Sequence, residues 1–159
     1  MFKIVGSCII LLCATYAGMR KYHKFYTRMR LISSIRDASI KIQNNLRCMC
    51  MPLYECFACS GEFFSGAAAF IREGALPSEA VREQCRRQTF LNAAEKECIN
   101  RFADGLCARD CEGQLANIEL FIAELSKHTE NAEKELETKG KLCVKGSILL
   151  AAAVILLMI

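Results

Sequence analysis

The sequence predicts an all-α protein, an antiparallel helical bundle flanked by N- and C-terminal transmembrane helices. Three observations point to this fold class. Apolar residues recur every three or four positions through the middle of the chain, no segment alternates as a strand does, and both ends are almost wholly apolar. With 159 residues, of which 53% are hydrophobic, the chain has room for one modest core. We therefore predict a transmembrane helix over residues 1–19, a helical bundle over residues 20–141 and a transmembrane helix over residues 142–159.

The first element is an apolar stretch over residues 4–19, which a basic stretch without acidic residues follows. A helix of about 16 residues rises roughly 24 Å. This is short of a hydrocarbon core of about 30 Å, but basic side chains at its end can snorkel to the headgroups. A cleaved signal peptide is the alternative, and the positive charge directly beyond the apolar stretch disfavours it. The basic residues after the predicted span are Arg20, Lys21, Lys24, Arg28 and Arg30.

Apolar spacing predicts that the first helix continues beyond the basic stretch, with a stripe over residues 25–49. Pro52 suits the first turn of a short helix that Ser60 and Gly61 close. The next helix is rich in phenylalanine and ends near Gly74.

Two further start signals follow along the chain. Pro77 opens another short helix, and Asn92 with Glu95 three residues later fits a capping box at the start of a longer one. The longest helix of the bundle begins near Asp110, and its apolar spacing is close to a heptad repeat. The residues of that stripe are Leu115, Ile118, Ile122, Leu125, Ala132 and Leu136.

The last element is the apolar stretch over residues 142–159, interrupted only by Lys145 and preceded by Lys139 and Lys141. Positive charge collects on the inner side of membrane helices, and both basic groups of this chain flank the same middle segment. We therefore expect the bundle to face the cytoplasm and both short tails to lie outside.

A dense group of cysteines, RCMCMPLYECFAC, occupies the sequence from Arg47 to Cys59. Four thiolates are able to hold zinc or an iron–sulfur cluster, so a membrane-bound metal or redox module is the alternative function. Cytoplasmic thiols are kept reduced, and free cysteine often packs as a small hydrophobe, which favours packing between helices. A secreted, disulfide-bonded protein is a third hypothesis and requires signal cleavage. The cysteines of the group are Cys48, Cys50, Cys56 and Cys59.

The motifs of catalysis are missing from the sequence. No G-x-x-x-x-G-K-[ST] phosphate loop is present, and His23 and His128 have no nucleophile pattern near them. The basic run with Tyr22 and Tyr26 is typical of nucleic-acid binding, but anionic lipid headgroups explain it better directly after a span. We predict no enzyme, no catalytic, cofactor-binding or metal residues, no cofactor and no nucleic-acid partner.

The segment GLCARDCEGQ, residues 105–114, resembles a pattern of the stage III sporulation protein AB family, LG-x-[ST]-D-x-x-x-Q. Leu106 ends one helix there, Asp110 starts the long one and Gln114 follows one turn later. The order of other features along the chain is also similar to that family. These features are the apolar span, the arginine-rich exit, the Pro52-Leu53 pair and the lysine-flanked terminal span. Two residues depart from the pattern: Cys107 replaces its glycine and Arg109 its Ser or Thr.

The resemblance implies a scaffold in the channel apparatus that joins mother cell and forespore in endospore-forming bacteria. Proteins of this family look like the helical cytoplasmic module of type II secretion platform proteins. The implied location is the outer forespore membrane, with the bundle on the mother-cell side. The implied partners are the lipid bilayer and other channel subunits, including a secretion-type ATPase, and self-association into a homo-oligomer stays open.

Two groups of residues are the predicted structural sites. Asp110, Gln114, Leu106 and Pro52 are expected to set turns and caps between helices. The second group is expected to orient the chain in the membrane and consists of Arg20, Lys21, Lys24, Arg28, Lys141 and Lys145.

Overall fold

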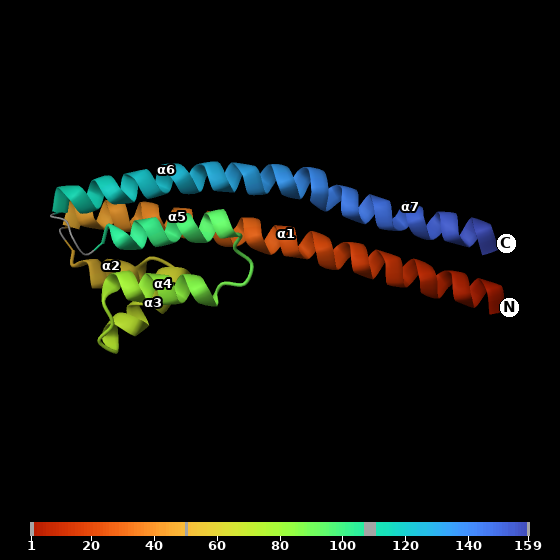
Figure 1. The fold of residues 1–159 in the computed structure, drawn as a ribbon, viewed down its shortest axis with the longest axis horizontal. Coiled ribbons are helices and arrows are strands. Elements are labelled where there is room, and N and C mark those ends of the chain that lie inside the picture. Colours follow the sequence, from red (N-terminus) through yellow and green to blue (C-terminus); the bar gives the residue numbers. More distant parts are fainter. Residues whose placement is uncertain (1, 50, 107–110, 159) are drawn as a thin grey trace. The chain divides into compact units, whose positions relative to one another are not determined.

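The computed structural model describes residues 2–49, 51–106 and 111–158, and every regular element within them is a helix. The all-α class predicted from the sequence is confirmed. In chain order the elements are α1 (Phe2–Met49), α2 (Leu53–Cys59), α3 (Glu62–Arg72), α4 (Pro77–Arg87), α5 (Ala93–Asp104), α6 (Cys111–Glu135), the π-helical segment η1 (Leu136–Gly140) and α7 (Lys141–Met158), as Figure 1 shows.

The chain forms two compact units. We call Arg30–Glu130 the bundle unit, and Met1–Met29 together with Asn131–Ile159 the terminal unit. α1 supplies residues to both units, because it runs without a break from the apolar N-terminal stretch to Met49, as the sequence predicted. The boundaries predicted at residues 19 and 142 separate membrane spans from the bundle. The division into these two units does not test them, so they stay predictions.

The bundle unit packs its short helices in sequence, α2 against α3, α3 against α4 and α4 against α5, while α6 lies beside α5 (Figure 1). Five phenylalanine side chains from α2, α3, α5 and α6 link these layers. Neighbouring rings lie with centroids between 4.2 and 6.3 Å apart, which is the range of favourable aromatic contacts. The rings belong to Phe57, Phe63, Phe64, Phe102 and Phe121. The α1 face against this core carries Ile32, Ile35, Ala38, Ile42 and Leu46, all buried.

Capping follows the sequence signals closely. The Asn92 side chain accepts a hydrogen bond from the Glu95 backbone, and the Glu95 carboxylate accepts one from the Asn92 backbone, both at 2.8 Å. This is the predicted capping box of α5. Pro52 occupies the position just before α2, with φ of −56°. Gly61 and Gly74 adopt φ of +102° and +100°, so they provide the turns after α2 and α3.

In the terminal unit, α7 runs antiparallel to the first part of α1, so that the start of α1 and the end of α7 lie at the same end of the pair (Figure 1). Small residues allow a close approach. A Cβ at Gly18 would lie 3.3 Å from the Cys143 carbonyl oxygen and closer still to the Ser147 hydroxyl, and one at Gly140 would lie 3.3 Å from the Tyr22 ring. Small residues serve this purpose where helices pair in membranes.

The predicted long helix does not end before the C-terminal apolar stretch. α6 passes directly into η1 and then α7, and only the π-helical turns of η1 separate the two α-helices. Within the part of the chain that the structure describes, no helix combines the length and apolar character needed to cross a membrane. The two predicted membrane spans are therefore not confirmed and remain a prediction.

Candidate interaction surface

The junction between α5 and α6 is held by a side chain that the sequence did not single out. The Asn117 side-chain amide, on α6, donates a hydrogen bond to the Phe102 carbonyl oxygen at 3.0 Å. This carbonyl belongs to the last turn of α5 and also accepts a hydrogen bond from the Gly105 backbone amide at 3.1 Å. Gly105 leaves the space that the amide occupies, because a Cβ at Gly105 would overlap the Asn117 side chain.

The structure describes only some of the residues that the sequence predicts for this junction. Asp110, with Cys107 and Arg109, lies outside the described residues. Leu106 is buried just after α5, and Gln114 lies half-buried in the first turns of α6. One signal for Asn117 is present in the sequence, since asparagine is a poor residue for a helix interior and usually has a specific partner there.

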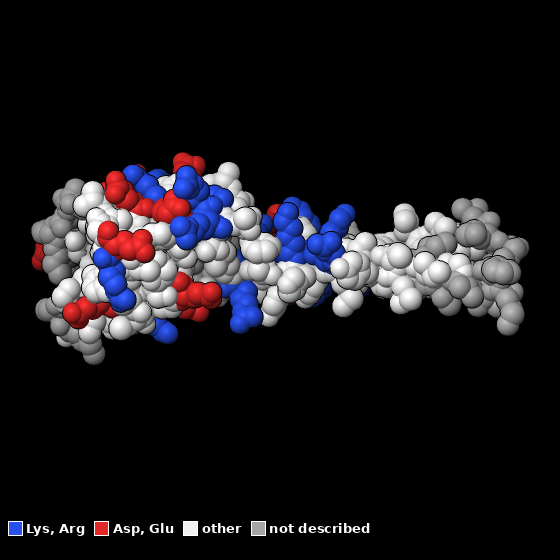
Figure 2. Space-filling view, turned by 90° about the horizontal axis from the view of Figure 1, so that it is seen from below, with Lys and Arg blue, Asp and Glu red and all other residues white. Residues whose placement is uncertain are grey.

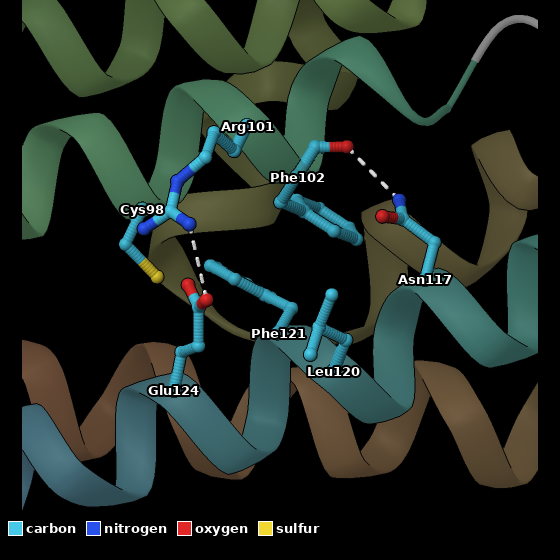
Figure 3. Close-up of a pocket in the computed structure, with 7 residues that line it drawn as sticks. All are labelled: Cys98, Arg101, Phe102, Asn117, Leu120, Phe121 and Glu124. Atoms are coloured by element: carbon cyan, nitrogen blue, oxygen red, sulfur yellow. Dashed lines mark hydrogen bonds and ion pairs between the residues drawn. The ribbon is translucent and has the colours of Figure 1, made fainter.

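A shallow groove lies beside this junction, with a volume of about 60 Å³. Figure 3 shows its lining side chains, which come from α5 and α6. The rings of Phe102 and Phe121 stack at its floor with centroids 4.2 Å apart, and Arg101 forms an ion pair with Glu124 at 3.2 Å. The lining residues are Cys98, Arg101, Phe102, Asn117, Leu120, Phe121 and Glu124.

The chemistry of this groove does not suit catalysis. Burial, together with a smaller effect of hydrogen bonding to the Glu124 carboxylate, raises the pKa of the Cys98 thiol to about 12. At neutral pH the thiol is therefore protonated, whereas a reactive cysteine is a thiolate. The groove volume of about 60 Å³ is also far below the roughly 300 Å³ of typical small-molecule pockets.

An apolar stripe on α6 makes this region suitable for contact with another protein. Ala116, Leu120 and Ala123 follow one another at spacings of four and three residues, and all three are exposed. Leu120 exposes 62% of its surface. We call these three residues the Leu120 surface. The spacing is that of a seam which packs against a second helix.

Polar bridges border the Leu120 surface on both sides. Glu119 accepts hydrogen bonds from Arg47 at 2.8 Å and from Gln43 at 3.0 Å, both on α1. Glu124 pairs with Arg101 on the side of α5. An exposed apolar centre with polar groups around it has the composition of a protein–protein contact.

The cysteines of the group predicted as an alternative site differ in exposure where the structure describes them. Cys48 and Cys59 are exposed, Cys56 is buried in the core, and Cys50 lies outside the described residues. Burial raises the pKa of the Cys56 thiol, with smaller effects from Cys59 and Glu55, and a redox site needs the opposite shift. Among the described residues, no three His, Cys, Asp or Glu side chains gather so that they could hold a metal ion. The metal or redox module has no support in these observations.

The predicted membrane-orienting residues all lie in the terminal unit. Arg20, Lys21 and Lys24 are exposed on α1, and Lys141 and Lys145 are exposed on α7. On the face drawn in Figure 2, Lys and Arg side chains gather on this unit beside a stretch whose described side chains are uncharged. We call these five residues the basic cluster.

Arg28 makes a contact that the sequence did not indicate. Its guanidinium pairs with the Glu135 carboxylate at 2.5 Å, and Lys139 donates to the same carboxylate at 2.7 Å. Hydrogen bonds from Lys139 and then Arg28 lower the pKa of Glu135, and this bridge joins α1 to α6 inside the terminal unit.

These features define a class of protein before any comparison. The chain is a helical protein with an exposed apolar surface on one unit, and with a pair of apolar helices bordered by basic residues in the other. Sequence comparison assigns it more closely: residues 3–159 match the family of stage III sporulation protein AB, and the chain belongs to that family. The resemblance seen in the sequence is thus confirmed, and membership supports a role in sporulation. No curated protein and no solved structure matches the chain significantly.

Proposed function

We propose that this chain is a non-catalytic membrane scaffold in the channel apparatus that joins mother cell and forespore during endospore formation. The observation that carries the proposal is the family match, which covers residues 3–159 and so includes both apolar ends and the bundle. The work of such a protein is geometric, because it holds a contact surface close to a bilayer.

Membrane insertion is supported by the side chains that the terminal unit leaves exposed. An exposed apolar surface of this extent marks contact with a membrane or another protein. A pair of short helices can cross a bilayer if the lipid thins locally and the basic side chains snorkel. Within the two predicted spans, residues 1–19 and 142–159, the described large apolar residues that are exposed are Ile9, Leu11, Leu12, Tyr16, Met19, Leu142, Ile148, Leu149, Leu150, Val154 and Leu156.

The basic cluster supports an orientation. Its residues follow the apolar part of α1 and precede that of α7, so both helices would carry positive charge on the side of the bundle. Positive charge stays on the cytoplasmic side of membrane helices. We infer a two-pass protein with its bundle in the mother-cell cytoplasm, at the outer forespore membrane.

The Leu120 surface is the proposed docking site for a neighbouring channel subunit, a secretion-type ATPase or a second copy of the chain. A few side chains that become fully buried near the centre of an interface contribute most of its affinity, and Leu120 lies at the centre of this surface. Replacing it by a charged residue leaves the fold intact, because the side chain is exposed in the free protein.

The test is complementation in an endospore-forming bacterium that lacks its own family member. We expect Leu120→Glu to reduce heat-resistant spore counts about tenfold or more, since a desolvated charge weakens binding by more than about 1.4 kcal/mol. Leu76→Glu is the matched control, because Leu76 is similarly exposed at 58% and precedes α4, far along the chain from α6. Equal spore counts for the two variants would reject the Leu120 surface as the docking site.

Insertion and orientation need a separate measurement. We expect the full chain to stay in the membrane pellet during alkaline carbonate extraction. In inside-out vesicles, added protease should cleave the bundle. Release of the protein by carbonate would reject the membrane scaffold. Protection of the bundle from the protease would indicate that the bundle lies on the opposite side of the membrane.

A further inference from the structure

A groove of about 240 Å³ lies on the terminal unit where α1 and α7 pack together. The function proposed above does not use it. Most of its lining side chains are small, and one is cationic. The lining residues are Ala17, Gly18 and Lys21 on α1 and Cys143, Gly146, Ser147 and Leu150 on α7.

Two glycines give the groove its floor and its open wall. At Gly18 the helices touch, because the Ser147 hydroxyl and the Cys143 carbonyl oxygen occupy the space of a Cβ. Ser147 is held in place, since its hydroxyl donates a hydrogen bond to the Cys143 carbonyl oxygen. At Gly146, by contrast, a Cβ would meet nothing within 4 Å. The groove is therefore closed at its base and open at Gly146.

The two ends of the groove differ in polarity. From Cys143 to Leu150 the wall on α7 rises by about 10 Å, at 1.5 Å per residue. Lys21 lies at the Cys143 end, because α1 runs antiparallel to α7 and Gly18 already faces Cys143 and Ser147. The opposite end is bordered by the exposed apolar side chain of Leu150.

Lys21 has no acidic partner among the described residues, and two of the three acidic residues of the same unit pair with other cations. Glu135 pairs with Arg28 and Lys139, and Glu137 pairs with Lys141 at 3.5 Å, while Glu133 is exposed. Lys21 also lies among the other members of the basic cluster, one residue from Arg20 and three from Lys24. An anion is therefore favoured at this end of the groove.

We propose that this groove binds one anionic phospholipid, with its phosphate at Lys21 and part of one acyl chain along Gly146 toward Leu150. The inference rests on the membrane insertion proposed above. A volume of about 240 Å³ is below the roughly 300 Å³ of typical small-molecule pockets, so it suits a segment of a flexible chain. An apolar helix in the same place would bury the Lys21 ammonium without a partner, which is costly inside a membrane.

The test uses the full chain in a neutral detergent, titrated with dioleoylphosphatidylglycerol or dioleoylphosphatidylcholine, with bound lipids counted by native mass spectrometry. We expect one phosphatidylglycerol molecule to bind more tightly than phosphatidylcholine. Lys21→Gln should weaken phosphatidylglycerol binding about fivefold, the size expected for one basic residue at an anionic surface. Lys24→Gln is the matched control, because Lys24 is one turn away on α1 but does not line the groove.

A second pair of variants tests the acyl chain. Gly146→Leu fills the open wall and should weaken both lipids, whereas Gly6→Leu should change neither. Gly6 is the matched control because a Cβ there also meets nothing within 4 Å, and it lies outside the groove.

Three results would overturn the proposal. Equal effects of Lys21→Gln and Lys24→Gln would mean general attraction to headgroups without a site. If Gly146→Leu leaves lipid binding unchanged, the acyl chain lies elsewhere. If Gly146→Leu instead abolishes a dimer of the protein, the groove binds a helix of a second copy. If the protein resists carbonate extraction but fails these lipid tests, only the lipid site is rejected. If carbonate releases the protein, the proposed membrane insertion is rejected as well.

Discussion

Asn117 joins the two helices at the Leu120 surface, because its side-chain amide donates a 3.0 Å hydrogen bond to the Phe102 carbonyl oxygen. The contact positions α6 against the end of α5 and stands next to the stacked Phe102 and Phe121 rings. A partly buried hydrogen bond of this kind contributes about 1 kcal/mol to the free energy of unfolding.

Gly105 and Asn117 should be energetically coupled. We expect Gly105→Ala to lower the free energy of unfolding by about 1 kcal/mol, because the new Cβ displaces the Asn117 amide from its carbonyl. In an Asn117→Ala background the same substitution should cost almost nothing. Urea unfolding of the four proteins in detergent measures the coupling energy. Strictly additive effects would show that the two residues do not share this contact.

The capping box of α5 gives a prediction with an internal control. Asn92→Ala should lower the free energy of unfolding by about 1 kcal/mol, since the backbone amide of Glu95 loses its acceptor. Asn100→Ala, at an exposed position within the same helix, should be neutral or slightly stabilising, because alanine is the better helix former. Thermal unfolding of both variants decides the matter, and equal midpoints would contradict the capping role.

Glu135 predicts a pH dependence of the terminal unit. Its folded-state pKa is lowered by Lys139 and Arg28, so its carboxylate stabilises the folded state above the ordinary pKa of glutamate. This contribution is lost as the pH falls through the lowered pKa. Glu135→Gln should therefore lower the thermal midpoint at pH 7, and the two proteins should converge as the pH falls below the lowered pKa of Glu135.

Glu137→Gln is the control for the same measurement. Glu137 is 71% exposed and pairs with Lys141 at 3.5 Å, so its removal should change the midpoint less. A difference between Glu135→Gln and the unchanged chain that persists at low pH would show that packing, and not the charge, is responsible.

The cysteines should differ in reactivity. Because the pKa of Cys98 is raised to about 12, iodoacetamide at pH 7.5, about one pH unit below an ordinary thiol pKa, should leave it unmodified. Cys48 and Cys59 are exposed and should be alkylated. Peptide mass spectrometry of the folded chain gives the extent at each position, with the unfolded chain as the control. Rapid alkylation of Cys98 in the folded chain would contradict its burial.

Much of the fold could be predicted, because local signals determine the helices. Proline and glycine mark the limits of α2 to α4. Asn92 and Glu95, three residues apart, form the capping box that marks the start of α5. The apolar spacing of α6 correctly places Ile118 and Leu125 in the core. All of these depend on residues that are close in sequence.

The interaction surface and the bridge inside the terminal unit could not be predicted in the same way, because their contacts join residues that are distant in sequence. The bond from Asn117 spans fifteen residues, and the Arg28 to Glu135 pair spans 107. Without a tertiary arrangement, Arg28 looked like one more basic residue beside a span, and Leu120 like one more apolar residue in a helix. Asp110 and Cys50 lie outside the described residues, so their predicted roles stay predictions.

The π-helical segment η1 sets the rotation of α7 relative to the end of α6. A π-helical turn accommodates more residues than an α-helical turn, and one residue corresponds to about 100° around an α-helix axis. Glu135 before the segment and Ser147 after it both face α1 with this spacing. Deletion of one residue between Leu136 and Gly140 would leave a regular helix of nearly the same length. This deletion would keep Ser147 toward Gly18, because eleven steps of about 100° from Glu135 return nearly to the same face. A regular helix that kept all twelve steps would turn Ser147 about 120° away. The segment η1 therefore absorbs one extra residue and keeps the two faces of the helix in phase.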